Sequence, residues 1–177
     1  KNEEETPTLA QKAGGLFVLK ELEDDVFDTF DNALNVKESA SSELKRLYRE
    51  LSDVSAAIKS TISGLLTDTD FTNDLRDTIY TQRDGRTVFQ VKAEAKNKIL
   101  GIVHDVSATG QTFFIEPKEL TELHNKQREI EIRINIETDR ISRAFSDEIC
   151  KHYDEILNTQ NLLAEIDFHF AKGKYSQ

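Results

Sequence analysis

The sequence has little that would make a chain flexible or cross-linked. Its 177 residues include no methionine, one cysteine, seven glycines and two prolines. Because methionine is absent, the first residue is not a translation start, and we expect the chain to be a segment of a longer protein. Cys150 has no second cysteine and no partners at metal-ligand spacing, which favours a helix residue in a reducing cytoplasm. Scarce glycine and proline beside 32% charged residues favour long helices over flexible linkers.

Long apolar runs and catalytic motifs are also absent. No run approaches the roughly 18–20 apolar residues that cross a bilayer, so we expect a soluble chain with no membrane partner. There is no G-x-x-x-x-G-K-S/T loop for binding nucleotide phosphates. His104, His124, His152 and His169 fall at no zinc or catalytic spacing with the acids around them. We therefore expect no metal, no cofactor and no catalysis in this chain.

Two of the histidines have more specific expectations. His124 and His152 lie in helical sequence, and we expect both at the surface. His104 precedes Asp105 and resembles part of a catalytic dyad, but no nucleophile accompanies the pair. A structural or interface role is therefore favoured for His104.

Residues 78–117 predict a small antiparallel sheet. The predicted strands, in chain order, are Thr78–Thr81, Thr87–Phe89, Ile99–Val103 and Thr112–Ile115. An Asp84-Gly85 pair joins the first two as in a β-hairpin, and the small residues at 107–110 suit a turn between the last two. Pro117 closes the sheet and suits the first turn of a helix.

Helical periodicity precedes the sheet. Apolar residues at steps of three and four predict a helix over 16–33, after a break at Gly14-Gly15 and before a short reversal at 32–37. A second helix is capped by Ser39 or Ser41 and runs to about Leu66. A short helical segment around Phe71 and Leu75 then leads into the strands.

A longer helix is expected after the sheet. No glycine or proline interrupts residues 118–172, which predicts one continuous helix of roughly 52 residues, about 80 Å long. The preceding helix of roughly 28 residues is only about 42 Å long, so it pairs with residues 118–145. The helix over 16–33 then pairs with residues 146–170, and both termini lie at the end far from the strands.

These elements predict a mostly α fold with a small β tip, in the α+β class: an elongated antiparallel arm of long helices that carries a short-stranded antiparallel sheet. The predicted parts are 1–77 for the outgoing helices, 78–117 for the β-rich tip and 118–177 for the return helix.

Charge is distributed unevenly along this arm. The net charge of −10 argues against nucleic-acid binding by the whole chain, because such binding relies on cations that displace counterions. Residues 78–104, however, carry five cations against two acids. The candidate nucleic-acid contacts are Arg83, Arg86, Lys92, Lys96 and Lys98. An ordinary solvated loop would explain so small an excess equally well.

Aromatic residues are interspersed among these cations. Tyr80, Phe89, Phe113 and Phe114 could stack on bases. Strand alternation nevertheless favours a packing role for the three phenylalanines.

A resemblance to a known family rests on motifs in the same region. The chain has Arg83-Asp84-Gly85-Arg86, Val91-Lys92, Gly101-Ile102-Val103-His104-Asp105, Ser107, Gly110, Thr112 and Phe114-Ile115-Glu116-Pro117. This series resembles the hallmark region of the second bacterial branch of the MutS family, with departures at Gln90 and Ala95. Two more stretches, Glu38–Leu44 and Ala164–Lys172, resemble the same family, so the likeness covers nearly the whole chain.

The resemblance implies a role as the lever and reduced clamp of a larger ATPase and endonuclease. ATP and Mg²⁺ would then bind in an ATPase domain outside this chain, and the parent would form a homodimer. Its targets would be branched DNA or collided ribosomes, and it would suppress homologous recombination. The alternative is a structural helical spacer whose tip mediates dimer contact. Clamping predicts solvent-facing cations, whereas dimerisation predicts an exposed apolar patch.

Overall fold

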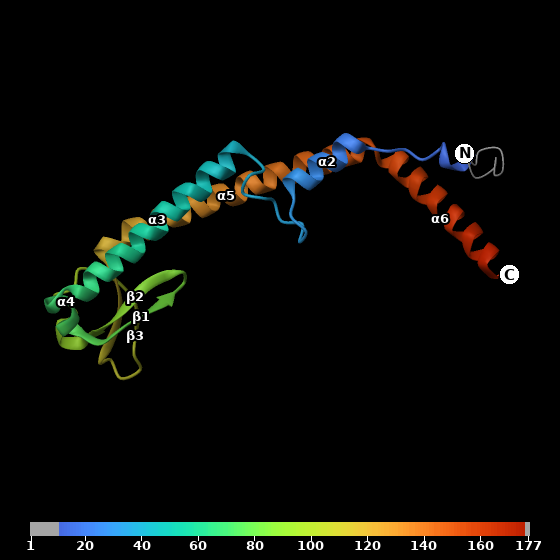
Figure 1. Cartoon of the computed structure of the whole chain (residues 1–177). Helices are drawn as coiled ribbons and strands as arrows, with labels where there is room; N and C mark the ends of the chain where they lie inside the picture. The colour runs from blue at the N-terminus through green and yellow to red at the C-terminus, as the bar shows by residue number, and fades with distance from the viewer. Residues whose placement is uncertain (1–10, 176–177) are drawn as a thin grey trace. The chain divides into compact units, whose positions relative to one another are not determined.

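The computed structural model describes residues 11–175 and divides into two compact units. One unit combines residues 11–40 with 138–175, and the other comprises residues 41–137. Figure 1 shows the elements, which in chain order are α2 (Lys20–Thr29), α3 (Ser42–Thr67), α4 (Thr69–Asp74), β1 (Leu75–Arg83), β2 (Arg86–Lys92), the 3-10 turn η1 (Ala93–Ala95), β3 (Gly101–Val106), β4 (Thr112–Pro117), α5 (Lys118–Lys151) and α6 (Tyr153–Tyr175). A mostly helical fold with a four-stranded antiparallel sheet confirms the predicted fold class.

Helix α3 and the part of α5 up to residue 137 are the long helices of the 41–137 unit. Ser41 caps α3 with its side-chain oxygen, which accepts a hydrogen bond from the Leu44 N–H at 3.0 Å. The Ser41 hydroxyl also donates to Glu137 at 2.9 Å, so the start of α3 lies beside residues near 137 of α5. The predicted antiparallel pairing of the two helices is confirmed (Figure 1).

A row of apolar residues gives this helix pair its core. The buried residues of α3 are Leu44, Leu47, Val54, Ile58 and Ile62. Their steps of three, seven and four residues place them on one face of the helix, as the sequence periodicity predicts. In the same unit α5 buries Leu120, Ile130 and Ile134.

The sheet has the strand order β1-β2-β4-β3, with every neighbouring pair antiparallel. In the predicted hairpin Arg83 pairs with Arg86, and the two turn residues Asp84 and Gly85 have φ of 49° and 77°. Two consecutive positive φ values define a type I′ turn, which only glycine and a few short polar residues adopt readily. The hairpin prediction is therefore confirmed.

The middle of the sheet supplies the second core. Phe89 is fully buried, and its ring meets Phe71 of α4 edge-on at 5.2 Å between centroids. Phe113 and Phe114 are only half-buried. The expectation of a packing role thus holds for Phe89, while the other two aromatic rings keep an accessible side.

Gly101 allows β3 to lie close against β4. A Cβ at this position would lie 2.1 Å from the Glu116 carbonyl oxygen, far inside van der Waals contact. Glycine at position 101 therefore permits the β3–β4 pairing that begins with Gly101 opposite Pro117.

In the other unit, α2 is shorter than the predicted helix over 16–33. Before α2 the Phe17 N–H donates to the Thr159 hydroxyl at 3.1 Å rather than to a helical carbonyl. After α2, the Asp31 side chain accepts from the N–H groups of Ala33 and Asn35, both at 2.8 Å, and closes a turn. These competing hydrogen bonds remove both ends of the predicted helix.

The predicted pairing of this segment with the return helix is confirmed. Phe30 meets Phe145 edge-on at 5.2 Å, Phe17 stacks on His152, and Lys12 forms an ion pair with Glu165. The last pair joins described residues close to the two ends of the chain, as expected.

The prediction of one continuous return helix is wrong. Helix α5 ends at Lys151, and α6 begins at Tyr153. The His152 N–H donates to the Ile149 carbonyl at 3.1 Å, three residues back rather than four, so a tighter turn interrupts the α-helical series. Neither glycine nor proline marks this position. Among residues 11–175 no helix combines the length and apolar character needed to cross a membrane.

Candidate nucleic-acid interface on the sheet

Two of the five candidate cations contact the end of α4, and a third lies over a ring of strand β4. Lys92 ends strand β2 and donates to the Asn73 carbonyl at 2.7 Å. Lys98 lies 2.9 Å from the Asp74 carboxylate, and the Lys96 ammonium lies 4.6 Å from the centre of the Phe113 ring. The chain reaches this arrangement because η1 and the loop after it turn back from β2 toward α4.

A fourth cation, Arg76, joins the same end of the sheet. Its guanidinium donates to the Thr112 hydroxyl at 3.1 Å, and Thr112 pairs directly with Lys92 across β4 and β2. Arg76 was missed in the sequence because β1 begins at Leu75, before the stretch that was expected to be extended. We call Arg76, Lys92, Lys96 and Lys98 the Lys92 cluster.

Arg83 lies at the opposite end of the sheet, next to the hairpin turn. Its guanidinium carbon lies 4.9 Å from the centre of the Phe114 ring, and its nearest acid is Asp105 at 3.9 Å. Half of the Arg83 side chain is exposed. An exposed guanidinium over an aromatic ring remains available to a phosphate or a base.

Arg86 has a different environment, although it flanks the same turn. Its Nη1 lies 2.9 and 3.2 Å from the two oxygens of Glu116, and its Nη2 donates to the Asn125 side chain at 2.6 Å. Glu116 is fully buried. The structure therefore groups Arg86 with a buried carboxylate and not with the Lys92 cluster.

Glu116 collects hydrogen bonds from three other elements of the unit. Besides Arg86 of β2, His104 of β3 lies 2.7 Å from Oε2, and His124 of α5 lies 2.8 Å from Oε1. Burial alone would raise the pKa of Glu116, but the hydrogen bonds from His124, His104 and Arg86 and the charge of Arg86 hold that pKa below its usual value. Glu116 is therefore an ionised acceptor. We call Glu116, Arg86, His104 and His124 the Glu116 network.

His124 is buried, so its predicted surface position is wrong. Its Nδ1 faces Glu116, while its Nε2 accepts the Thr87 N–H at 3.4 Å. These two contacts fit the tautomer that carries its hydrogen on Nδ1, toward Glu116, and accepts at Nε2. His104, which donates to Glu116, has the structural role expected for it.

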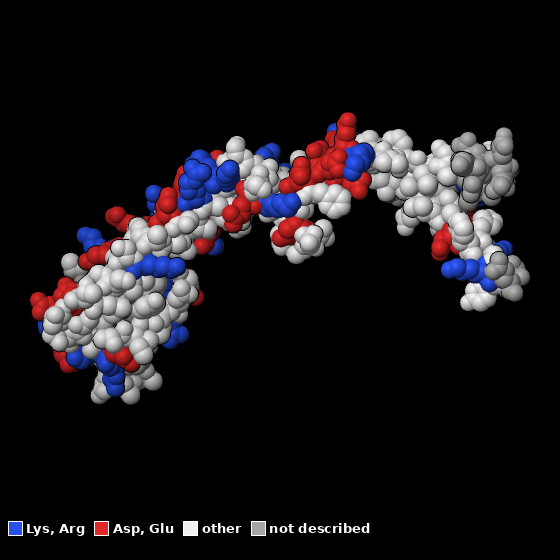
Figure 2. Space-filling view, viewed as in Figure 1, with Lys and Arg blue, Asp and Glu red and all other residues white. Residues whose placement is uncertain are grey.

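Exposed apolar side chains also occur on the sheet, on its two edge strands. They are Ile79 and Tyr80 of β1, Leu100 just before β3, and Ile102, Val103 and Val106 of β3. In the view of Figure 2 the sheet region is largely uncharged at its centre, with charged side chains around its margin. Both features that were expected to separate clamping from dimerisation are therefore present.

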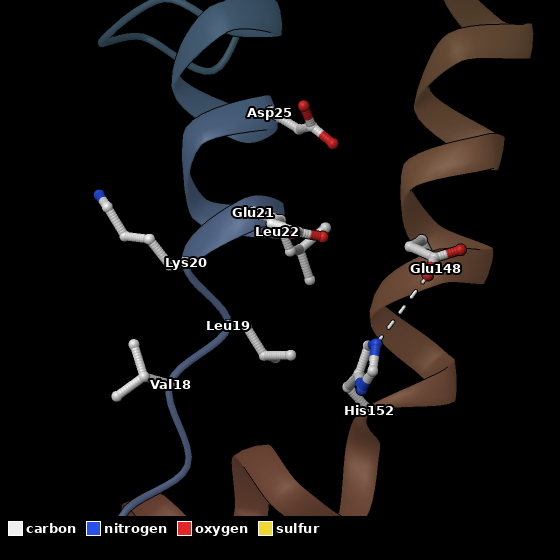
Figure 3. Close-up of a pocket in the computed structure, with 8 residues that line it drawn as sticks. All are labelled: Val18, Leu19, Lys20, Glu21, Leu22, Asp25, Glu148 and His152. Atoms are coloured by element: carbon white, nitrogen blue, oxygen red, sulfur yellow. Dashed lines mark ion pairs between the residues drawn. The ribbon is translucent and has the colours of Figure 1, made fainter.

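A cavity beside His152 in the other unit is lined mainly by residues of α2 and the segment just before it. It has a volume of about 470 Å³ and lies between α2 and the break at His152 (Figure 3). His152, a half-buried residue rather than a surface one, lies 3.9 Å from Glu148. Within residues 11–175 no group of three or more histidine, cysteine or acidic side chains is placed to hold a metal ion.

No family model matches the chain. Comparison with curated proteins finds several similar sequences that share one name. The chain is 35% identical over 177 residues to Endonuclease MutS2 of Clostridium acetobutylicum, covering 99% of this chain and 22% of that protein. It is 36% identical over 163 residues to the protein of that name from Clostridium novyi, and 30% identical over 170 residues to that of Clostridioides difficile. The chain spans about a fifth of the length of these relatives.

Proposed function

We propose that this chain, which resembles a segment of the MutS2 branch of the MutS family over nearly its whole length, is the lever and nucleic-acid-binding tip of a MutS2-type protein. The observation that carries the proposal is the Lys92 cluster. It places four cations at one end of a small sheet in a chain whose net charge is −10. Concentrated cations within an acidic chain suit a local phosphate contact.

The lysines of the Lys92 cluster have weak contacts that they can exchange for phosphate oxygens. Lys92 bonds a neutral carbonyl, Lys96 lies on an aromatic ring, and the Lys98–Asp74 pair is largely exposed on its lysine side. Exposed pairs of this kind contribute little, about 0–1 kcal/mol. Phosphate oxygens would therefore replace these partners at small cost.

Arg83 lies at the opposite end of the sheet from the Lys92 cluster. The strand from Arg86, opposite Arg83, to Lys92 is about 20 Å long at the usual rise per residue. That length matches about six phosphate steps along one strand of a duplex. The sheet would then contact a length of nucleic acid rather than a single phosphate.

The remaining functions belong to the longer protein. ATP and Mg²⁺ would bind in an ATPase domain outside this chain, which would itself perform no catalysis. The parent would act as a homodimer on branched DNA or on collided ribosomes and suppress homologous recombination. Helices α3 and α5 would carry motion between the ATPase domain and the sheet.

One observation favours the second candidate, a spacer that dimerises through its tip. Ile102, Val103 and Val106 are exposed on β3, an edge strand with unpaired backbone groups. The bulge between Val103 and Asp105 makes this edge irregular, which opposes pairing with a second sheet. The cation surface is therefore the better supported of the two.

The test compares two triple variants of the full-length protein with equal charge changes. The lysine variant has glutamine in place of Lys92, Lys96 and Lys98. The α3 variant has glutamine in place of three exposed residues of α3, Lys45, Arg49 and Lys59. Binding to duplex DNA, a four-way junction and ribosomes is measured at several salt concentrations. For a duplex, loss of three phosphate contacts lowers the slope of log K against log salt by about 2–3, because each contact contributes about 0.9.

The α3 variant should retain the slope of the unchanged protein. Equal effects of the two variants would reduce the proposal to a nonspecific charge effect. Unchanged affinity and salt slope in the lysine variant would refute the proposed nucleic-acid contact and favour the spacer hypothesis. Sedimentation of the chain would then show whether it dimerises.

A further inference from the structure

We infer that Arg86 is not a phosphate ligand, and that the Glu116 network is a joint that fixes the hairpin and the sheet on α5. If the proposed function holds, Glu116 positions the nucleic-acid-binding side chains without touching nucleic acid. Only this consequence rests on the proposed function.

The four side chains of the Glu116 network come from four different elements. Arg86 lies on β2, His104 on β3, Glu116 on β4 and His124 on α5. All four meet at one carboxylate, with distances from 2.7 to 3.2 Å. One buried residue therefore connects three strands to the helix.

Both oxygens of the Glu116 carboxylate accept two contacts each. Oε1 accepts from Arg86 and His124, and Oε2 accepts from Arg86 and His104. If Arg86 turned outward to a phosphate, Glu116 would remain buried without its only permanently charged partner. Burying an unpaired charge is strongly unfavourable, so Arg86 stays where Glu116 holds it.

His124 contacts the backbone of the hairpin in addition to the Glu116 carboxylate. The pairing of β2 with β4 ends at Phe89, so the Thr87 N–H lies beyond it. That N–H donates to Nε2 of His124 instead. Because Thr87 is buried, its N–H would otherwise lack a partner, and α5 supplies the one it has.

A cavity beside the network leaves the hairpin turn dependent on hydrogen bonds for its attachment to α5. It has a volume of about 410 Å³ and lies between the turn at Asp84-Gly85 and the α5 residues Gln127, Arg128 and Glu131. Side chains thus do not fill the space between the turn and the helix. The hairpin is held to α5 at this end by the Glu116 network and by the Arg86–Asn125 bond.

A displacement of α5 against the sheet must therefore break the network or carry the hairpin with it. Of the candidate cations, Lys92 lies on β2, which the network connects to α5. Arg76 and Arg83 lie on β1, which pairs with β2, and Lys96 and Lys98 lie between β2 and β3. Their positions relative to α5 consequently depend on Glu116, which makes Glu116 a positioning residue for binding.

The test uses the two arginines that flank the same turn. In the full-length protein, Arg86→Gln should accelerate hydrogen exchange of the amides of residues 84–91 by about tenfold or more, since the turn loses its link to α5. It should lower nucleic-acid affinity by the same factor at every salt concentration, leaving the salt slope unchanged. Arg83→Gln is the matched control, which should lower the slope by about 0.9 and leave the exchange unchanged.

A double variant distinguishes the two possible roles of Arg86, as part of the joint or as a phosphate contact. Glu116→Gln alone should resemble Arg86→Gln, whereas Arg86→Gln combined with Glu116→Gln removes both charges and should restore slow exchange and affinity to within about threefold of the unchanged protein. If Arg86 contacts phosphate, the double variant binds no better than Arg86→Gln, and the slope falls. Either result would overturn the inference.

The exchange measurement is made without nucleic acid, so it stands apart from the proposed function. Rescue of exchange in the double variant, together with no effect of any cation on binding, would keep the joint and refute the nucleic-acid interface. Unchanged exchange in both single variants would refute the joint whatever the binding data show.

Discussion

Replacing the Glu116 carboxylate by an amide tests how much the buried network stabilises the 41–137 unit. Glu116→Gln keeps the size of the side chain and opens no cavity, so its effect comes from charge and hydrogen bonding. The carboxylate accepts four contacts from three residues, and Arg86, its permanently charged partner, is 27% exposed. The amide leaves that cation without a counter-ion.

The hydrogen bonds themselves are partly retained in this variant. The amide oxygen can still accept from Arg86 and His124, and the amide N–H₂ can donate to His104 if that ring moves its hydrogen to Nδ1. The charge-assisted bonds to the two histidines, each about 1.5–3 kcal/mol, become neutral ones of about 0.5–1.5 kcal/mol, and Arg86 loses its ion pair, while the cost of burying the carboxylate disappears. We expect a net loss of about 2–3 kcal/mol in the free energy of unfolding.

The assay is urea unfolding of the 177-residue chain followed by circular dichroism. With a slope of about 2 kcal/mol per M, the midpoint of the 41–137 unit should fall by about 1 M or more. The control is Glu129→Gln on α5, an exposed residue whose replacement should change the free energy by less than about 0.5 kcal/mol. A shift for Glu116→Gln no larger than the control would show that the network contributes no net stability.

The same variant predicts a pH dependence with a defined sign. The pKa of Glu116 is lower in the folded chain than its ordinary value of 4.5. A lowered folded-state pKa gives stability that is present above the ordinary value and is lost as the pH falls through the folded-state value. The difference in unfolding free energy between the unchanged chain and Glu116→Gln should therefore shrink below about pH 4.5.

Two further predictions concern local structure. Gly85→Val should destabilise the hairpin, because φ at position 85 is 77° and β-branched residues are strained there; faster hydrogen exchange confined to β1 and β2, with α3 unchanged, would support this. Ser41→Ala should lower the unfolding free energy by about 1 kcal/mol through loss of the α3 cap, with exposed Ser42→Ala as the control. Equal effects of the two serine variants would show that the cap does not stabilise α3.

The elements that were predicted well from the sequence are those whose determinants are local. The hairpin follows from Asp84-Gly85, because few residue pairs adopt two positive φ values in succession. The start of α3 follows from Ser41, whose side chain reaches a backbone N–H only three residues away. In both cases the residues that fix the structure lie next to one another in the sequence.

The break at His152 could not be predicted in the same way. It coincides with contacts from residues more than 130 positions away, since Phe17 stacks on His152 and donates its backbone N–H to Thr159. Those contacts arise only after the two segments have packed together. The local sequence, which has no glycine or proline between residues 118 and 172, favours a continuous helix.

The candidate site was predicted in part for a related reason. A count of charges finds Arg83, Lys92, Lys96 and Lys98, and it also includes Arg86, because a cation looks the same in sequence whether or not it has a buried partner. The partner, Glu116, lies 30 residues away on β4. Arg76 was left out since the first strand begins earlier than its β-branched residues indicate.

The Glu116 network also changes what the family motif describes. Arg86, His104 and Glu116 come from three separate parts of the motif on which the resemblance rests, and they meet at one carboxylate. Three motif positions therefore specify how the sheet is attached to α5. Arg76, Lys96 and Lys98 of the Lys92 cluster lie outside those motif positions, although they lie on or beside the same strands. Lys92 and Arg83, by contrast, are motif positions themselves, so the motif contains residues of the joint together with two of the cations that we propose for binding.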